Sequence, residues 1–190
     1  QFLGALLVLE MFRCGTHIAG RPAAALTAFA VALIVPLLFY SFQVYPELPA
    51  ALLLLFAFRK IVLDPSPSAP GALVAGTALA ALPWLHQKYS VVAFVLALFG
   101  LSRFLHRSVG RFALEPLKLA LFSLPLLLSA YSVFLYNHAL TGSLSPSATF
   151  AAVSRTSFAP AGLPRGLLGL LFDRENGLLV FAPFYALALV

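Results

Sequence analysis

The sequence predicts an all-α fold, a polytopic transmembrane helix bundle. Of its 190 residues, 62% are hydrophobic and only 9% are charged, whereas a soluble domain carries about 25% charged residues. The mean hydropathy is +0.99. The hydrophobic residues also lie in runs that short polar connections separate, which is the pattern of a chain that crosses a bilayer several times.

Seven apolar runs follow one another, and we expect each to form all or part of a span in a single transmembrane domain, residues 1–190. A span needs about 20 apolar residues, with roughly 17 as the lower limit. The first run stops at Arg13, and Pro22 opens the second in a position suited to a first helical turn. Both chain ends lie inside apolar runs, so we expect a fragment of a longer chain. The expected spans are residues 1–12, 23–42, 46–63, 71–85, 89–105, 114–136 and 177–190.

Residues 137–176 are the one long stretch without an apolar run of membrane length. A structureless loop of this size is uncommon and is usually functional or disordered. The short apolar piece GLLGLLF lies inside it, at residues 166–172. We therefore expect a long loop with a re-entrant or interfacial helix that lies over the membrane domain.

The basic residues are dispersed at the ends of the apolar runs, which favours a topology signal over a surface that binds nucleic acid. Because cytoplasmic loops are enriched in Lys and Arg, the side with more of them is expected to be cytoplasmic. The long loop then faces the cell exterior or periplasm. The richer side holds Arg13, Arg21, Arg59, Lys60, Arg103, Arg107, Arg111 and Lys118, and the other holds Lys88, Arg155, Arg165 and Arg174.

Glu47 is the most informative acidic residue. Eleven apolar residues separate it from Arg59, which is about 16–17 Å of helix and well short of a hydrocarbon core of about 30 Å. We interpret Glu47 as an acid in a polar cavity below the outer surface, where ionisable residues are functional candidates. The alternative is that Pro46 opens a helix and Glu47 complements its dipole in the first turn. The sequence leaves both interpretations open.

His86 and Lys88 stand at the expected outer junction of two short spans. A Lys point charge and a proton-carrying His suit an anionic head group. The alternative, which the sequence favours, is an interfacial anchor that includes Trp84. Asn137 and His138 are candidates to bind sugar hydroxyls or simply to end a helix.

Motifs for other chemistries are missing from the sequence. There is no phosphate-binding Gly loop, no Cys/His cluster with metal-ligand spacing, no Gly-x-Ser-x-Gly elbow and no dinucleotide fingerprint. The single cysteine, Cys14, excludes an internal disulfide. We expect no cofactor, although a divalent metal is not excluded.

Four segments, in order, resemble segments of bacterial membrane glycosyltransferases of the GT-C superfamily, relatives of the dolichyl-phosphate-mannose–protein mannosyltransferases and the aminoarabinose transferases. The resemblance covers most of residues 26–190. The segments are YSFQVYPELPAALLLLFAFR (40–59), LPWLHQKYSVVAFVLALFGL (82–101), YNHALTGSLSPS (136–147) and GLLGLLFDRENGLLVFAPFYALAL (166–189).

The resemblance implies a GT-C-like fold that transfers a sugar, with inversion, from a polyprenyl-phosphate donor on the non-cytoplasmic face of a bacterial inner membrane. The usual catalytic acid loop would lie upstream of Gln1, so the catalytic base is unknown. The resemblance makes Glu47 a cavity acid and makes His86 and Lys88 donor-phosphate contacts. It makes the long loop a lid, and further substrate contacts would come from Asn137, Arg165 and Arg174.

The partners implied are the lipid bilayer, the lipid-linked sugar and other membrane subunits. Two alternatives of different class stay open. One is a non-catalytic membrane subunit of a larger complex. The other is a transporter, for which broken helices and charges at the membrane midplane are expected.

Overall fold

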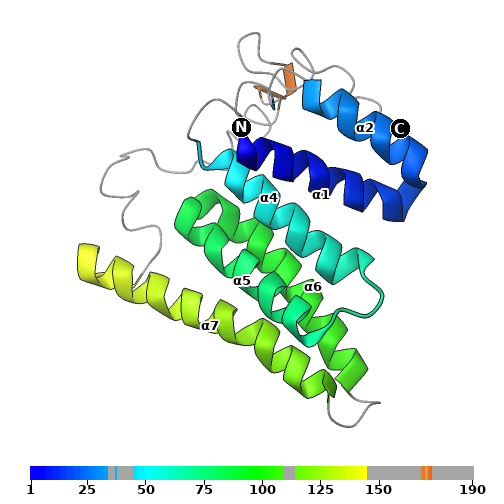
Figure 1. The fold of residues 1–190 in the computed structure, drawn as a ribbon. Coiled ribbons are helices and arrows are strands. Elements are labelled where there is room, and N and C mark those ends of the chain that lie inside the picture. Colours follow the sequence, from blue (N-terminus) through cyan, green and yellow to red (C-terminus); the bar gives the residue numbers. More distant parts are fainter. Residues whose placement is uncertain (34–36, 38–44, 109–113, 145–167, 170, 173–190) are drawn as a thin grey trace. The chain divides into compact units, whose positions relative to one another are not determined.

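The computed structural model describes the chain except for residues 34–36, 38–44, 109–113, 145–167, 170 and 173–190, and it describes no side chains at 106–108 and 114–115 (Figure 1). Every regular element in the described part is helical, so the all-α prediction is confirmed. The α-helices are α1 (Phe2–Ala19), α2 (Arg21–Leu33), α4 (Glu47–Phe58), α5 (Ala69–Leu85), α6 (Ser90–Ser108) and α7 (Leu114–Thr141). Two short elements join them, the π-helix η1 (Arg59–Leu63) and the 3-10 helix η2 (Gln87–Tyr89).

The chain divides into two compact units, Gln1–Pro146 and Ser147–Val190. The six α-helices named above lie in the first unit. Within the second unit the structure describes only the helical residues 168–169 and 171–172. The expected seventh span, 177–190, and most of the expected interfacial helix therefore lie outside the described residues.

The prediction of seven spans is wrong in its count. Among the described residues, three helices are long and apolar enough to cross a membrane: Phe2–Ala19, Gln87–Leu105 and Pro116–Thr141. Three such helices indicate a multi-pass membrane protein. In the runs at 46–63 and 71–85 the α-helices have 12 and 17 residues, and the run at 46–63 continues as the π-helix η1. The run at 23–42 is described as helix as far as Leu33.

Two helix ends differ from the prediction, and glycines explain both. The first run was expected to stop at Arg13, yet α1 continues to Ala19 and ends at Gly20, whose φ is 81°. The long loop was expected from residue 137, yet α7 continues to Thr141 and ends at Gly142, whose φ is 70°. Glycine adopts a positive φ without a Cβ penalty, so the chain can turn away from the helix at both positions. A polar side chain alone does not stop the hydrogen-bond ladder.

The helices of the first unit alternate in direction (Figure 1). α1, α4 and α6 run one way, and α2, α5 and α7 run back. The ends of these described helices therefore gather at two ends of the bundle.

Phe122 of α7 is the centre of the core. It is completely buried, and its ring lies 5.3 Å, centroid to centroid, from that of Phe104 in α6. The Phe122 backbone lies so close to Gly76 of α5 that a Cβ on that glycine would overlap the Phe122 carbonyl. Small residues allow such close backbone approach between membrane helices. The buried alanines of α5 (Ala72, Ala75, Ala78 and Ala80) continue the same packing.

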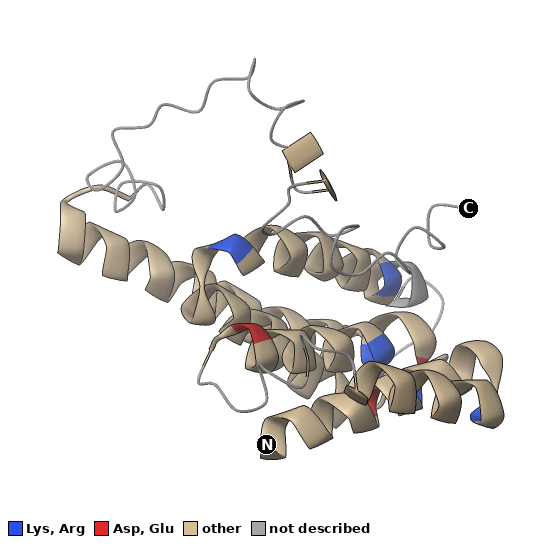
Figure 2. Cartoon of the chain, turned by 90° about the horizontal axis from the view of Figure 1, so that it is seen from above, with Lys and Arg blue, Asp and Glu red and all other residues tan. Residues whose placement is uncertain are grey.

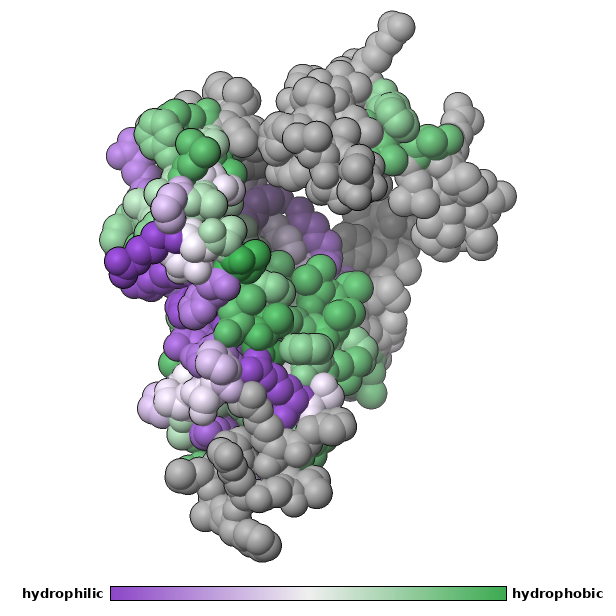
Figure 3. Space-filling model, turned by 90° about the vertical axis from the view of Figure 1, so that its right-hand side faces the viewer, coloured by the Kyte–Doolittle hydropathy of each residue, from purple (hydrophilic) through white to green (hydrophobic). Residues whose placement is uncertain are grey.

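Large apolar side chains also cover the outside of the helices. Figure 3 shows apolar surface, in green, beside polar surface, in purple. A soluble monomer rarely exposes so much contiguous apolar surface, whereas a membrane helix exposes it to lipid. The outward residues of α6 and α7 include Val91, Phe94, Val95, Leu98, Leu124, Leu127, Leu128 and Tyr131.

Candidate functional site

The candidate site lies at the end of the bundle where α4 begins. Pro46 precedes α4 with a helical φ of −68°, and Glu47 occupies the first turn. The side chain of Lys88, in η2, reaches Glu47 from the junction of α5 and α6, and its Nζ donates to Glu47 Oε1 at 2.7 Å. We call these two residues the Glu47 pair. Figure 2 shows that charged residues are few and that long uncharged helical segments separate them.

The 3-10 turn η2 fixes the position of Lys88. The backbone N–H of Lys88 donates to His86 Nδ1 at 3.1 Å, so the His86 side chain caps this short helix. The Lys88 ammonium lies 5.1 Å from the centroid of the Tyr89 ring, a cation–π distance. His86 and Tyr89 rings meet edge to face, with centroids 6.1 Å apart. The sequence residues HQKY therefore build one compact unit that presents an ammonium group.

The Glu47 pair has unused hydrogen-bonding capacity. The second carboxylate oxygen of Glu47, Oε2, is buried and has no hydrogen-bond partner within the part of the chain that the structure describes. The same holds for the hydroxyl of Tyr89. Buried polar atoms are normally paired, and an unpaired one requires an explanation such as a bound group. Both side chains of the pair are accessible to solvent, because Lys88 is half exposed and Glu47 is one-third exposed.

The structure brings together three of the predicted site residues, Glu47, His86 and Lys88. Asn137 is buried near the C-terminal end of α7, apart from the loop in which the sequence placed it, and its role as a substrate contact stays a prediction. Arg165 and Arg174 lie outside the described residues. For Glu47 both interpretations remain compatible with the structure, since it stands in the first turn of a helix and also binds a cation.

A second charged cluster was missed by the sequence reasoning. Glu10 of α1 accepts hydrogen bonds from Arg59, whose Nε reaches Oε2 at 2.7 Å and whose Nη2 reaches Oε1 at 3.2 Å. Arg13 Nη1 donates to Oε1 at 2.7 Å. We call Glu10, Arg13 and Arg59 the Glu10 triad. The signal was present, because Glu10 is the one charged residue inside the first apolar run, and ionisable residues there are functional candidates.

The Glu10 triad lies at the other end of α4. Its Glu10 and Arg59 side chains are only 7% and 13% exposed, so the carboxylate and one guanidinium are withdrawn from solvent, while Arg13 is half exposed. On the far side of η1, Arg103 of α6 donates to the carbonyl oxygens of Ile61, Val62 and Asp64. A cation at these carbonyls complements the negative end of a helix dipole.

No three His, Cys, Asp or Glu side chains group together as a candidate metal site within the described ranges. Neither family models nor curated proteins nor solved structures give a match to this chain.

Proposed function

We propose that this chain is part of an integral membrane glycosyltransferase that uses a polyprenyl-phosphate-linked sugar on the non-cytoplasmic face of a bacterial inner membrane. One observation carries the proposal. At one helix end, a half-exposed ammonium stands beside a buried carboxylate oxygen that has no hydrogen-bond partner among the described residues. A sugar phosphate supplies the matching groups, an anion for the ammonium and hydroxyl donors for the carboxylate.

In this proposal Lys88 binds the phosphate of the donor. An ammonium is a compact point charge that contacts phosphate oxygens without demanding one orientation. Glu47 holds Lys88 in place through Oε1 before the donor arrives. Its second oxygen, Oε2, accepts a hydrogen bond from a hydroxyl of the sugar or of the acceptor. Glu47 is a positioning residue here, and the catalytic base is not assigned to any residue of this chain.

Donor binding by the full-length protein tests the proposal. A polyprenyl-phosphate sugar is titrated into the purified protein in detergent, and the dissociation constant is compared among variants. We expect Lys88→Ala to weaken binding and Lys88→Arg to weaken it less, because the second variant keeps the charge. Lys60→Ala is the matched control, since Lys60 is also an ion-paired lysine, bonded to Asp64 at 3.4 Å beside the other end of α4.

Unchanged donor binding in Lys88→Ala would contradict the proposal and would leave His86 and Lys88 as interfacial anchors. Binding without transfer to any acceptor would instead favour the non-catalytic subunit. A turnover assay on the same preparation separates these two outcomes.

A further inference from the structure

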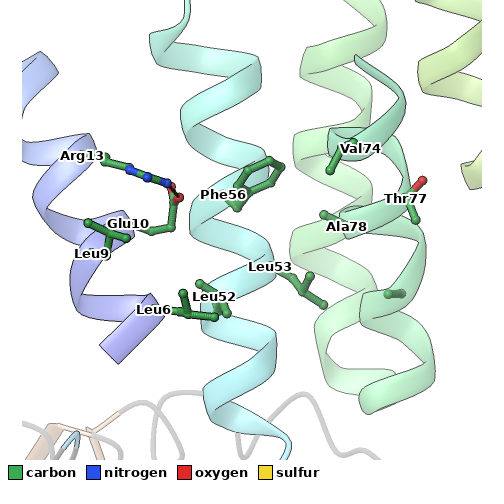
Figure 4. A pocket seen from close by; sticks show the side chains of 11 residues that line it. Leu6, Leu9, Glu10, Arg13, Leu52, Leu53, Phe56, Val74, Thr77 and Ala78 are labelled. Carbon is green, nitrogen blue, oxygen red and sulfur yellow. Dashed lines mark hydrogen bonds and ion pairs between the residues drawn. The ribbon is translucent and has the colours of Figure 1, made fainter. Parts of the chain in front are cut away.

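A groove runs along α4 between α1 and α5. Its cavity measures about 380 Å³, within the range of roughly 300–1,000 Å³ that small-molecule sites occupy. Figure 4 shows the side chains that line it, from Leu6 and Leu9 of α1, through Leu52, Leu53 and Phe56 of α4, to Val74, Thr77 and Ala78 of α5. Apart from Thr77, these side chains are hydrocarbon, so the groove suits an apolar chain.

The same groove has a charged end. Glu10 and Arg13 line it and point towards one another (Figure 4). The Glu10 triad contains two guanidinium groups and one carboxylate, so it carries one positive charge in excess. Arg59 is directed at Glu10 through two nitrogens and is almost buried. Arg13 lines the groove and is half exposed, and its bond to Glu10 is made through Nη1, so other N–H donors of its guanidinium remain for a ligand.

We propose that this groove binds an anionic glycerophospholipid, with the lipid phosphate at Arg13 and one acyl chain along the apolar wall. Guanidinium groups bind phosphate oxygens with charge-assisted hydrogen bonds, often in pairs. Basic pockets between membrane helices on the cytoplasmic side are known to hold phospholipid head groups. The inference does not depend on the proposed transferase activity, because the groove and the Glu47 pair lie at different parts of α4.

Two observations favour a lipid over a water-soluble anion. A soluble phosphate gains no binding energy from the apolar wall, which makes up most of the lining. The groove also adjoins α1, which is itself long and apolar enough to cross a membrane.

Native mass spectrometry of the full protein tests the proposal. The probes are dioleoyl-phosphatidylglycerol and dioleoyl-phosphatidylcholine, added in equal amounts to the purified protein in a neutral detergent. We expect the protein to retain one molecule of phosphatidylglycerol in preference to phosphatidylcholine. Arg13→Gln should lower its affinity by at least about tenfold, the effect of losing a hydrogen bond to a charged group. Circular dichroism verifies folding, which the remaining Glu10–Arg59 contacts support.

Arg21→Gln is the matched control. It removes the same charge at the same end of the helices from an exposed residue that does not line the groove, so it should leave the affinity unchanged. A third variant, Thr77→Phe, fills the groove from an exposed position and should also lower phosphatidylglycerol retention. This variant tests the acyl-chain part of the site.

Four results would overturn the proposal. They are full retention in Arg13→Gln, an equal loss in Arg21→Gln, no effect of Thr77→Phe, and displacement of the lipid by millimolar inorganic phosphate. The second would indicate general attraction of anionic lipid to a basic surface. The fourth would indicate a site for soluble anions.

Discussion

The two charged clusters stand at opposite ends of α4 and differ in burial. The Glu10 triad withdraws a carboxylate and a guanidinium from solvent and satisfies both carboxylate oxygens. The Glu47 pair leaves its lysine half exposed and one carboxylate oxygen without a hydrogen-bond partner among the described residues.

This difference in burial indicates that the Glu10 triad stabilises the fold, whereas the Glu47 pair can bind a ligand. A buried ion costs several kcal/mol to desolvate and is kept only with its partner in place. The Glu10–Arg59 contact is therefore expected to hold α1 against α4 permanently. An ion pair at a solvated helix end gains little from its mutual attraction, so Lys88 can exchange Glu47 for a ligand at small cost.

The largest expected effect is a difference in thiol labelling between the two ends of α4, which we expect to lie on opposite sides of the membrane. In a Cys14→Ser background, Tyr45→Cys and Ser66→Cys place one exposed thiol before α4 and one after η1. We expect a membrane-impermeant maleimide added outside whole cells to label position 45 and to reach position 66 only after permeabilisation. Labelling in the reverse pattern would move the Glu47 pair to the cytoplasm and remove the basis of the proposed transferase site.

The next effect is the loss of the buried carboxylate. Glu10→Ala leaves Arg59, which is only 13% exposed, without its counter-charge. Breaking a buried ion pair from one side costs about 3–5 kcal/mol, so we expect the free energy of unfolding to fall by about that amount. Reversible unfolding in mixed micelles measures the change, with Glu47→Ala as the control at the other end of α4. A loss below about 1 kcal/mol, the size found for exposed pairs, would show that water reaches the triad.

A double substitution tests whether the Glu10–Arg59 pair does more than compensate buried charge. Replacing a buried ion pair by hydrophobic residues of similar volume is often neutral or stabilising. We expect Glu10→Leu combined with Arg59→Met to recover most of the stability that Glu10→Ala loses, measured by the same unfolding experiment. If the double variant is no more stable than Glu10→Ala, the triad contributes something beyond charge compensation, such as hydrogen bonds that position α1.

The smallest effect on stability is expected at the Glu47 pair. Glu47→Gln keeps the shape of the side chain and removes the charge that holds Lys88. We expect the melting temperature to change little, because the pair is accessible to solvent. Turnover of the full-length protein should fall at least about tenfold, since Lys88 loses its fixed position. A destabilised protein with full turnover would make Glu47 a structural residue of the α4 N-terminus.

Much of the helix layout follows from the sequence. Apolar runs must form helices in a membrane, because every backbone polar group needs an internal partner there. The breaks that the sequence placed near Pro46 and in the Pro- and Ser-rich stretch 64–71 therefore separate helices in the structure as well. The sequence failed where a polar residue was read as a stop, at Arg13 and Asn137. α1 continued through Gly15 and ended before Gly20, and α7 ended before Gly142, two glycines with positive φ.

The pairing of the charged residues was decided only by the tertiary structure. Glu10 and Arg59 are 49 residues apart, and Glu47 and Lys88 are 41 apart. The apolar runs place Glu47, Arg59 and Lys88 near span ends and Glu10 inside a run, which was enough to predict that Glu47, His86 and Lys88 share one end. Which side chains meet depends on the rotation of each helix about its axis. Close packing between helices sets that rotation, for example where the Phe122 backbone lies against Gly76. The sequence pattern of one helix does not specify the surface of the helix that packs against it.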